Sequence, residues 1–313
     1  MKKKILVVGS LNMDMVVDVQ HIPVVGETIM GRNLNYIPGG KGANQAFSAG
    51  KLGGDVAMLG AVGEDEAGDK LILSLASAGV DTSRIRRAKE LPTGTAIITV
   101  NDKGNNSIVV IGSANESCTV EYIRENEDLL EASDYIMLQM EIPLETIHYV
   151  ISRAHDLGKT VILNPAPAPA EIAGEILMKI DFLTPNETEL QILTGEHADT
   201  LQGIEAGAAK LLRQGVRNVL VTLGERGAGH LEDNRLSVVP TRKVDAVDTT
   251  AAGDCFNGAF VVALAEGKTL EQAVAFANAA SSIAVTRKGA QTSIPEREEV
   301  EARLAERFSV PEN

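Results

Sequence analysis

The sequence predicts an α/β protein whose central, mostly parallel sheet is flanked by helices in a Rossmann-like three-layer arrangement. Short apolar runs, such as residues 5–8 and 219–222, are typical of strands that are buried on both faces. Segments with helical periodicity, such as residues 41–52 and 145–157, separate these runs along the chain. Because parallel strands need a crossover between them, this alternation predicts helices that cover both faces of one sheet.

The other core elements follow the same alternation. Further strands are expected at residues 56–59, 135–138, 161–163 and 182–183, with further helices at 70–78 and 203–214. After Asp254 the pattern becomes mostly helical, through residues 270–285 and 296–308. The carboxyl ends of the strands should share one edge of the sheet, which is where ligands bind in open α/β folds.

Two segments break this alternation and predict additional antiparallel strands outside the main sheet. Residues 13–37 contain the β-favouring runs 15–19 and 27–36, with Pro and Gly as punctuation. Residues 94–111 have two β-rich arms around the turn-forming Asn-Asp-Lys-Gly-Asn-Asn, which is the pattern of a hairpin. A small sheet made from both segments would cover the site as a lid, although two decorative surface hairpins would give the same pattern.

These segments divide the chain into a core and a lid. The core is expected to comprise residues 1–12, 38–93 and 112–313, and the lid residues 13–37 and 94–111. An exposed small sheet has an apolar face to bury, so we expect the lid to pair with that of a second copy in a homodimer.

Composition excludes several classes of partner. The 313 residues carry a net charge of −14, and aromatic residues make up 3% with no Trp, which argues against a nucleic-acid partner. An anionic substrate would then need a locally basic pocket and a divalent cation. Cys118 and Cys255 lie far apart, as expected in a reducing, cytoplasmic compartment. The apolar run after the N-terminal lysines is too short for a signal peptide, and no run approaches the ~20 residues of a membrane span.

Residues 248–258, Asp-Thr-Thr-Ala-Ala-Gly-Asp-Cys-Phe-Asn-Gly, place a carboxylate behind a loop of small residues at a predicted helix start. The unpaired N–H groups and partial positive charge of a helix N-terminus attract anions, and the small side chains of Ala252 and Gly253 let an anion approach. Asp254 in the first turn could then take a proton from a hydroxyl during phosphoryl transfer. An Asp that only stabilises the helix dipole would look the same.

Residues 39–46, Gly-Gly-Lys-Gly-Ala-Asn-Gln-Ala, form a second Gly-rich start of a predicted helix. A cation at a helix N-terminus is unfavourable for the helix, so Lys41 suggests a function such as binding an anion or several hydroxyls. Asn44 lies at i+3 and can face the same way as Lys41. The alternative is a solvated Lys beside a turn. The spacing does not match a Walker A loop.

Polar residues also follow other strands of the predicted sheet. Asn12 and Asp14 come just after the first strand, and Glu141 follows the strand at 135–138. Asn and Asp offer donors and acceptors suited to sugar hydroxyls, although turn chemistry alone also selects them. Because strand ends in such a sheet meet at one edge, these residues are expected at the ligand-binding crevice.

The second half of the chain offers a candidate nucleotide side. Asn186 and Glu189 have an i,i+3 spacing that fits a water-mediated magnesium site or a helix capping box equally well. The glycines of residues 222–229 could admit nucleotide phosphates or adenine. No helix follows them, and the turn after the first strand lacks the glycines of an NAD-dependent oxidoreductase. Residues 285–293 could line a nucleotide, supply carbonyls to a cation, or form an ordinary solvated loop.

Together these motifs resemble the ribokinase family of sugar kinases, the PfkB-type kinases, over nearly the whole chain. Residues 39–46 match the N-terminal signature of the family, residues 248–254 match its C-terminal signature, and Asn186-Glu-Thr-Glu189 matches its N-x-x-E motif. The resemblance implies ATP-dependent phosphorylation of D-ribose at the 5-hydroxyl, which gives D-ribose 5-phosphate and ADP. It also implies Mg²⁺ bound with ATP and K⁺ as an activator.

The resemblance assigns roles to individual residues. Asp254 is implied as the base, with the N–H groups of Ala252, Gly253 and Asp254 as an anion hole. The sugar would be held by Asn12, Asp14, Gly40, Lys41, Asn44, Glu141 and Asp254. ATP would contact Asn186, Thr222, Leu223, Gly224, Glu225, Arg226, Gly227, Gly253 and Asn278. Potassium would lie among Asp248, Thr250, Ala284, Arg287, Gly289 and Ser293, mostly on carbonyls, and Glu189 would reach magnesium through water.

Other activities stay open. The nearest alternative is a kinase of the same family for deoxyribose, a nucleoside or another sugar, because pocket size is invisible in a sequence. A non-catalytic sugar or nucleotide sensor would bind ligand without producing ADP, and Asp254 beside Gly253 disfavours it. Cys255 departs from the family, in which Thr is commoner, and is expected to be a packing residue near the helix start.

Overall fold

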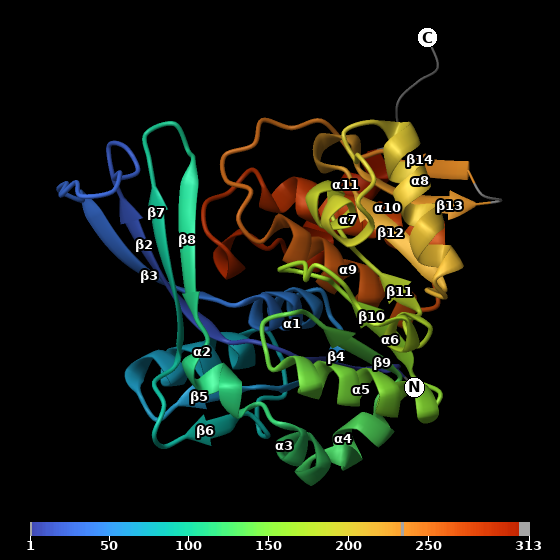
Figure 1. Ribbon diagram of the computed structural model, residues 1–313, viewed down its shortest axis with the longest axis horizontal. Helices are drawn as coiled ribbons and strands as arrows, with labels where there is room; N and C mark the ends of the chain where they lie inside the picture. Colours follow the sequence, from blue (N-terminus) through green and yellow to red (C-terminus); the bar gives the residue numbers. More distant parts are fainter. Residues whose placement is uncertain (1, 233–234, 307–313) are drawn as a thin grey trace.

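The computed structural model describes residues 2–232 and 235–306, and its main sheet has eight strands in the order β14-β13-β12-β11-β10-β9-β1-β4 (Figure 1). Neighbouring strands from β4 to β12 pair in parallel, whereas β13 pairs antiparallel with both β12 and β14. The strands are β1 (Lys4–Val8), β4 (Asp55–Leu59), β9 (Tyr135–Leu138), β10 (Thr160–Leu163), β11 (Phe182–Leu183), β12 (Asn218–Thr222), β13 (Ala228–Glu232) and β14 (Arg235–Val239). The predicted mostly parallel sheet is therefore confirmed.

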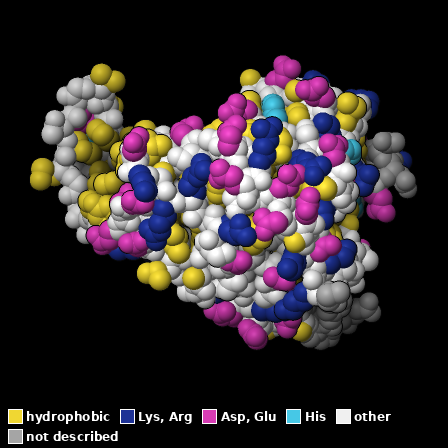
Figure 2. Space-filling view, turned by 90° about the horizontal axis from the view of Figure 1, so that it is seen from below, with side chains coloured by type: hydrophobic (Ala, Val, Ile, Leu, Met, Phe, Trp, Pro, Cys, Tyr) yellow, Lys and Arg dark blue, Asp and Glu magenta, His cyan; other side chains and the backbone are white. Residues whose placement is uncertain are grey.

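Four further strands form a separate small sheet that projects from the core in Figure 1, in the order β3-β2-β7-β8. Its strands are β2 (Asn12–Asp18), β3 (Asn33–Gly39), β7 (Gly94–Val100) and β8 (Asn106–Ile111). Each predicted segment forms an antiparallel hairpin, but the two hairpins join through β2 and β7, which run parallel. Figure 2 shows hydrophobic side chains gathered on this projecting part, which we call the lid. A two-stranded sheet of β5 (Ala61–Gly63) and β6 (Arg86–Ala88) completes the strands.

The helices cover the main sheet on both faces, as two separate buried clusters show. One cluster lies under α1 (Lys41–Lys51), α2 (Glu66–Ser77), α9 (Ala252–Ala265), α10 (Leu270–Ala284) and α11 (Arg297–Glu306). The other lies under α3 (Val120–Glu125), α4 (Glu127–Ala132), α5 (Leu144–Asp156), α6 (Gly174–Leu177), α7 (Glu187–Thr194) and α8 (Leu201–Arg213). Successive residues of β1 alternate between the two clusters, which explains why its sequence is a continuous apolar run.

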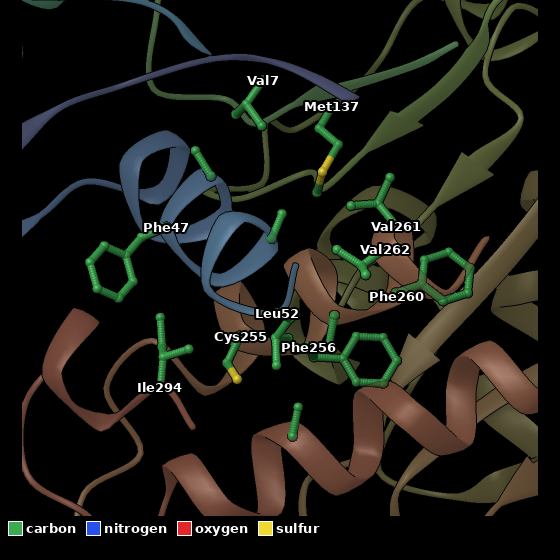
Figure 3. Close-up of a cluster of buried hydrophobic side chains, with 14 of the residues drawn as sticks. Val7, Phe47, Leu52, Met137, Cys255, Phe256, Phe260, Val261, Val262 and Ile294 are labelled. Atoms are coloured by element: carbon green, nitrogen blue, oxygen red, sulfur yellow. The ribbon is translucent and has the colours of Figure 1, made fainter. Parts of the chain in front are cut away.

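The first cluster fixes the two helices that matter most for the site. In Figure 3, Val7 and Met137 of the sheet lie in the same cluster as Leu52, just after α1, and Phe260 of α9. The two helices approach closely because Gly258 of α9 lies against α1, where a Cβ would come within 2.6 Å of the Ser48 Cβ. Cys255 is fully buried in this cluster. The N-termini of α1 and α9 are thereby held side by side.

The predicted boundaries are correct to within a few residues, with identifiable exceptions. The predicted helix at 70–78 begins at Glu66, because the Asp65 side chain accepts a hydrogen bond from the N–H of Gly68 and caps the helix start. The predicted helix at 296–308 begins at Arg297, and residues 307 and 308 lie outside the described residues. Within the described part of the chain, no helix is long and apolar enough to span a bilayer.

Candidate active site

Asp254 lies in the first turn of α9, 7% exposed, at the point where α9 meets α1. Its Oδ2 accepts a hydrogen bond of 3.0 Å from Nδ2 of Asn44, and its Oδ1 accepts one of 3.0 Å from Nε2 of Gln45. Both donors belong to α1, so two helices from opposite ends of the sequence fix one carboxylate. The arrangement exceeds what a helix-dipole contact needs, because such a contact requires no donor from another helix.

The start of α9 has the backbone geometry of an anion site. Ala251 adopts a left-handed conformation with φ of 57°, and among the described residues no side chain caps the helix. The N-terminal N–H groups therefore face the space beside Asp254 rather than a capping oxygen. The N–H of Ala252 already donates to the carbonyl of Thr249 over 3.2 Å, so Gly253 and Asp254 are the better placed of the three predicted anion-hole donors.

A second group of polar residues lies where β2 and the Gly-rich turn meet. Asp14 of β2 is 8% exposed, and a Cβ at Gly39 would overlap its carboxylate, so only a bare glycine leaves room for Asp14 there. Glu141 follows β9, and its Oε2 accepts hydrogen bonds from the Ser10 hydroxyl at 2.6 Å and the Lys41 N–H at 3.1 Å. Gly40 precedes α1 with φ of 89°, a conformation that glycine adopts without strain.

The charged side chains of this group shift one another's pKa values. Burial, together with the charges of Glu141 and Asp254, raises the pKa of Asp14 to about 7 against the opposing charge of Lys41. Burial also raises the pKa of Asp254, against the opposing effects of Lys41, Gln45 and Asn44. Burial lowers the pKa of Lys41, but the surrounding carboxylates outweigh this and raise its pKa overall. Lys41 is therefore a half-buried ammonium among carboxylates.

Two adjoining cavities extend from this group along the strand ends. The first, of about 200 Å³, is polar and is lined by Lys41, Asp254, Asn164 and Glu189 among others. The second, of about 330 Å³, is more apolar and includes Val244, Ala246 and Phe256 in its lining. Both cavities share four residues at the β12 end and the start of α9, which are Thr222, Thr249, Ala252 and Gly253. A ligand with a polar and an apolar end can therefore occupy both.

Most residues of the predicted ATP set line these cavities. The apolar cavity is lined by Thr222, Gly224, Glu225, Gly227, Gly253 and Asn278, and the polar cavity by Asn186. Two others do not line either cavity, because Leu223 is buried in the core and Arg226 pairs with Glu187. Asn278 also donates from Nδ2 to the carbonyl of Val239 over 2.8 Å, which ties α10 to the end of β14.

Asn186 and Glu189 form the capping box that was one of the two interpretations of their spacing. Oδ1 of Asn186 accepts from the N–H of Glu189 at 2.8 Å, and Oε2 of Glu189 accepts from the N–H of Asn186 at 2.9 Å. The pKa of Glu189 is raised, chiefly by burial, which the hydrogen bond from Asn186 and the charge of Lys41 oppose. Glu189 still lines the polar cavity, so a role in the cap does not remove it from the site.

The loops predicted to hold potassium lie against each other. Oδ2 of Asp248 accepts from the N–H of Gly289 at 2.9 Å, and its Oδ1 accepts from the N–H of Thr250 at 2.9 Å. These hydrogen bonds outweigh burial and hold the pKa of Asp248 below its usual value. Arg287 turns away to pair with Glu299, while its N–H donates to the carbonyl of Ala284. The buried Ser293 bonds the carbonyl of Ala290.

Sequence reasoning missed residues whose partners are distant in the chain. Gln45 was only part of a quoted motif, and Gln139, Asn164 and Ser10 were not singled out, although all four are buried beside the site. On the lid, strand register places Ala96, Ile98, Val110 and Ile108 on the same face as Asp14. The two-residue alternation from Ala96 could have identified this face.

Comparison with known proteins gives one consistent family. Residues 2–297 match the pfkB family carbohydrate kinases. The chain is 41% identical to the ribokinase of Haemophilus influenzae over 96% of this chain and 97% of that protein. It is 39% identical to a deoxyribokinase of Salmonella typhimurium over 94% and 96%. The structure of Arabidopsis thaliana ribokinase complexed with ribose and ATP superposes with a TM-score of 0.89, at 35% identity over 97% and 99% of the two chains. The chain belongs to the pfkB family of carbohydrate kinases.

Proposed function

We propose that this kinase transfers the γ-phosphoryl group of ATP to the 5-hydroxyl of D-ribose. The observation that carries the proposal is the position of Asp254, a buried carboxylate that lines the polar cavity and is near enough to Asp14 and Glu141 for the charges to influence one another. A base at that point faces both a sugar hydroxyl and a nucleotide phosphate. The matches to ribokinases over the whole chain support ribose as the acceptor.

The residues divide the chemistry between them. Asn12, Asp14, Asn44 and Glu141 would orient the sugar hydroxyls, and Asp254 would accept the proton of the attacking hydroxyl. The N–H groups at the start of α9 would bind the charge that develops on the transferred phosphoryl group. Lys41, which lines the polar cavity with Asp254, would add a full positive charge there. The apolar cavity would take the base of ATP.

Cations would assist in two ways. Magnesium enters with ATP, mostly bound to phosphates and water, and Glu189 would hold it through water. The Asp248 carboxylate, kept ionised by its N–H donors, fits a monovalent cation together with the carbonyls of the adjoining loop. Asp248, Thr250, Ala284, Arg287, Gly289 and Ser293 would hold potassium, which would neutralise charge near the anion hole.

A coupled assay of ADP release tests the proposal directly. We expect ribose to be the best acceptor, with deoxyribose slower because it lacks one hydroxyl for the carboxylates, and potassium to raise activity over sodium. The deoxyribokinase relative makes deoxyribose the specific second candidate. Equal rates with potassium and sodium would contradict the proposed potassium site. A higher kcat/KM for deoxyribose than for ribose would make deoxyribose the substrate. Ligand binding without ADP would indicate a sensor.

The raised pKa of Asp14 predicts a pH dependence. Since kcat/KM reports ionisations of the free enzyme, kcat/KM for ribose should fall as the pH decreases through about 7, because protonated Asp14 loses acceptor capacity. In the unfolded chain this carboxyl ionises near its ordinary pKa of 3.8, whereas in the folded protein its pKa is about 7, so stability is lost progressively as the pH rises from about 4 to about 7. Because Asn does not titrate, the Tm of Asp14→Asn relative to wild type should be higher at pH 8 than at pH 4, by about 2 °C or more. An equal gain at both values would show that the pKa is not raised.

We further propose that two copies pair through their lids. On the face opposite Asp14, register aligns Tyr36, Ile97, Val109 and Ile111, which are 40–59% exposed. Val109→Lys should convert a dimer to a monomer in analytical ultracentrifugation, because a charge on this face cannot be buried without a partner. Leu73→Lys, at an exposed apolar position on α2, is the matched control and should leave the dimer intact. A Val109→Lys protein that stays dimeric would place the interface elsewhere.

A further inference from the structure

Gln45 of α1 is completely buried beside Asp254 and uses every polar group of its side chain. Its Nε2 donates to Oδ1 of Asp254 at 3.0 Å and to Oδ1 of Asn164 at 3.1 Å. Its Oε1 accepts from Nε2 of Gln139 at 2.8 Å. A buried glutamine in an apolar helix interface is costly unless satisfied in this way.

The amide of Gln45 can point in one direction only. Asn164 donates its Nδ2 to the carbonyl of Thr184 at 2.9 Å, so its Oδ1 must face Gln45 as an acceptor. A flipped Gln45 would place its oxygen against that acceptor and against the Asp254 carboxylate. It would also place its NH₂ group against the NH₂ of Gln139. The fixed carbonyl of Thr184 thus determines the orientation of Gln45.

Gln139 contacts Gln45 through its Nε2, and its other polar atom, Oε1, is unpaired within the described part of the chain. Its Oε1 is buried and has no hydrogen-bond partner among the described residues. The side chain packs against Gly9, where a Cβ would overlap it, so the close passage of a glycine makes room for this amide. An unpaired buried oxygen costs free energy. Gln139 nevertheless occupies this position, where its Nε2 donates a hydrogen bond to Oε1 of Gln45.

We propose that Gln45, supported by Gln139, is a positioning residue that fixes the orientation of the Asp254 carboxylate for proton transfer. Gln45 does not line either cavity, so it acts through Asp254 rather than on a substrate. With Asn44 on Oδ2 and Gln45 on Oδ1, the carboxylate is held at both oxygens and cannot rotate. The same donors favour its ionised form, which burial opposes. The inference rests on the proposed role of Asp254 as the base.

Gln45→Met tests the inference because Met keeps the volume and removes the hydrogen bonds. We expect kcat to fall about 10–100-fold with both KM values within about threefold, since a misplaced base affects the chemical step. The acid limb of the kcat profile should move up by about one pH unit, because Asp254 loses a donor that favours its ionised form. Gln139→Met should move the acid limb in the same direction by a smaller amount. This variant replaces Gln45→Met in the test if Gln45→Met does not fold.

Ser48→Ala is the matched control, one turn further along α1 in the same interface with α9, where its hydroxyl bonds the carbonyl of Cys255 at 3.1 Å. It should leave the acid limb in place. An unmoved limb in folded Gln45→Met, or an equal shift in Ser48→Ala, would overturn the inference. A carboxyl-detected NMR titration of Asp254 in wild type and Gln45→Met needs no turnover. It therefore separates failure of this inference, an unchanged pKa, from failure of the proposed function, absence of kinase activity.

Discussion

Asp254→Asn is expected to lower kcat about 10²–10⁴-fold while the dissociation constant for ribose changes little, because the amide keeps the shape of the side chain but cannot accept the proton. Asn44 and Gln45 both donate to this carboxylate, so the NH₂ of the new amide meets one donor. The buried charge is removed at the same time. Since burial raises the pKa of Asp254, its ionised form destabilises the protein as the pH rises. The variant should therefore be at least as stable as the wild type at pH 8.

Three measurements check this expectation together. Steady-state ADP release gives kcat, calorimetric titration of ribose gives affinity, and thermal unfolding at pH 8 gives stability. Asp128→Asn, at a surface position paired with Arg84, provides the control and should leave all three unchanged. Turnover of ribose by Asp254→Asn near the wild-type rate would show that another group takes the proton. A loss of stability would show that the carboxylate is mainly structural.

The core strands were predictable because each of them is a run of consecutive apolar residues, the pattern of a strand that is buried on both faces. β1, β9, β10 and β12 are apolar runs that alternate between two buried clusters, and helices with clear periodicity separate them. The hairpin of β13 and β14 was not predicted, since residues such as His230 and Glu232 interrupt any apolar run. The parallel pairing of β2 with β7 was also missed. Pairing between separate segments depends on tertiary contacts that local sequence does not contain.

The candidate site divides in the same way. Asn12, Lys41 and Asp254 were identifiable because each stands at or near the start of an element, where polar groups reach a ligand, and Lys41 and Asp254 also follow a glycine. Gln45 and Gln139 were not, because their partners lie 94 and more residues away, and a glutamine inside a helix looks like ordinary helix content. The spacing of Asn186 and Glu189 left two interpretations open, and only coordinates could reveal the capping box.

Lys41→Met should reduce kcat/KM for ribose about 10³-fold, the second largest effect that the site predicts. The half-buried ammonium lies among Asp14, Glu141, Glu189 and Asp254, and it lowers the pKa of Asp14, Glu189 and Asp254. Met has a similar length without the charge. Its introduction removes a cation from the phosphoryl group and raises the pKa of Asp254 and Asp14, so that more of each is protonated at pH 7.

The loss of the cation and the protonation of the carboxylates can be distinguished by their dependence on pH. Protonation of the carboxylates is reversed at higher pH, so kcat/KM of Lys41→Met should recover in part between pH 7 and 9, whereas the lost stabilisation of phosphoryl charge stays. Lys41→Arg is the comparison that keeps the charge. Its wider planar group does not fit a site built for a compact ammonium, so it should restore the pH profile better than the rate. A kcat/KM of Lys41→Met within tenfold of wild type would place Lys41 outside the chemistry, as a charge that only balances buried carboxylates.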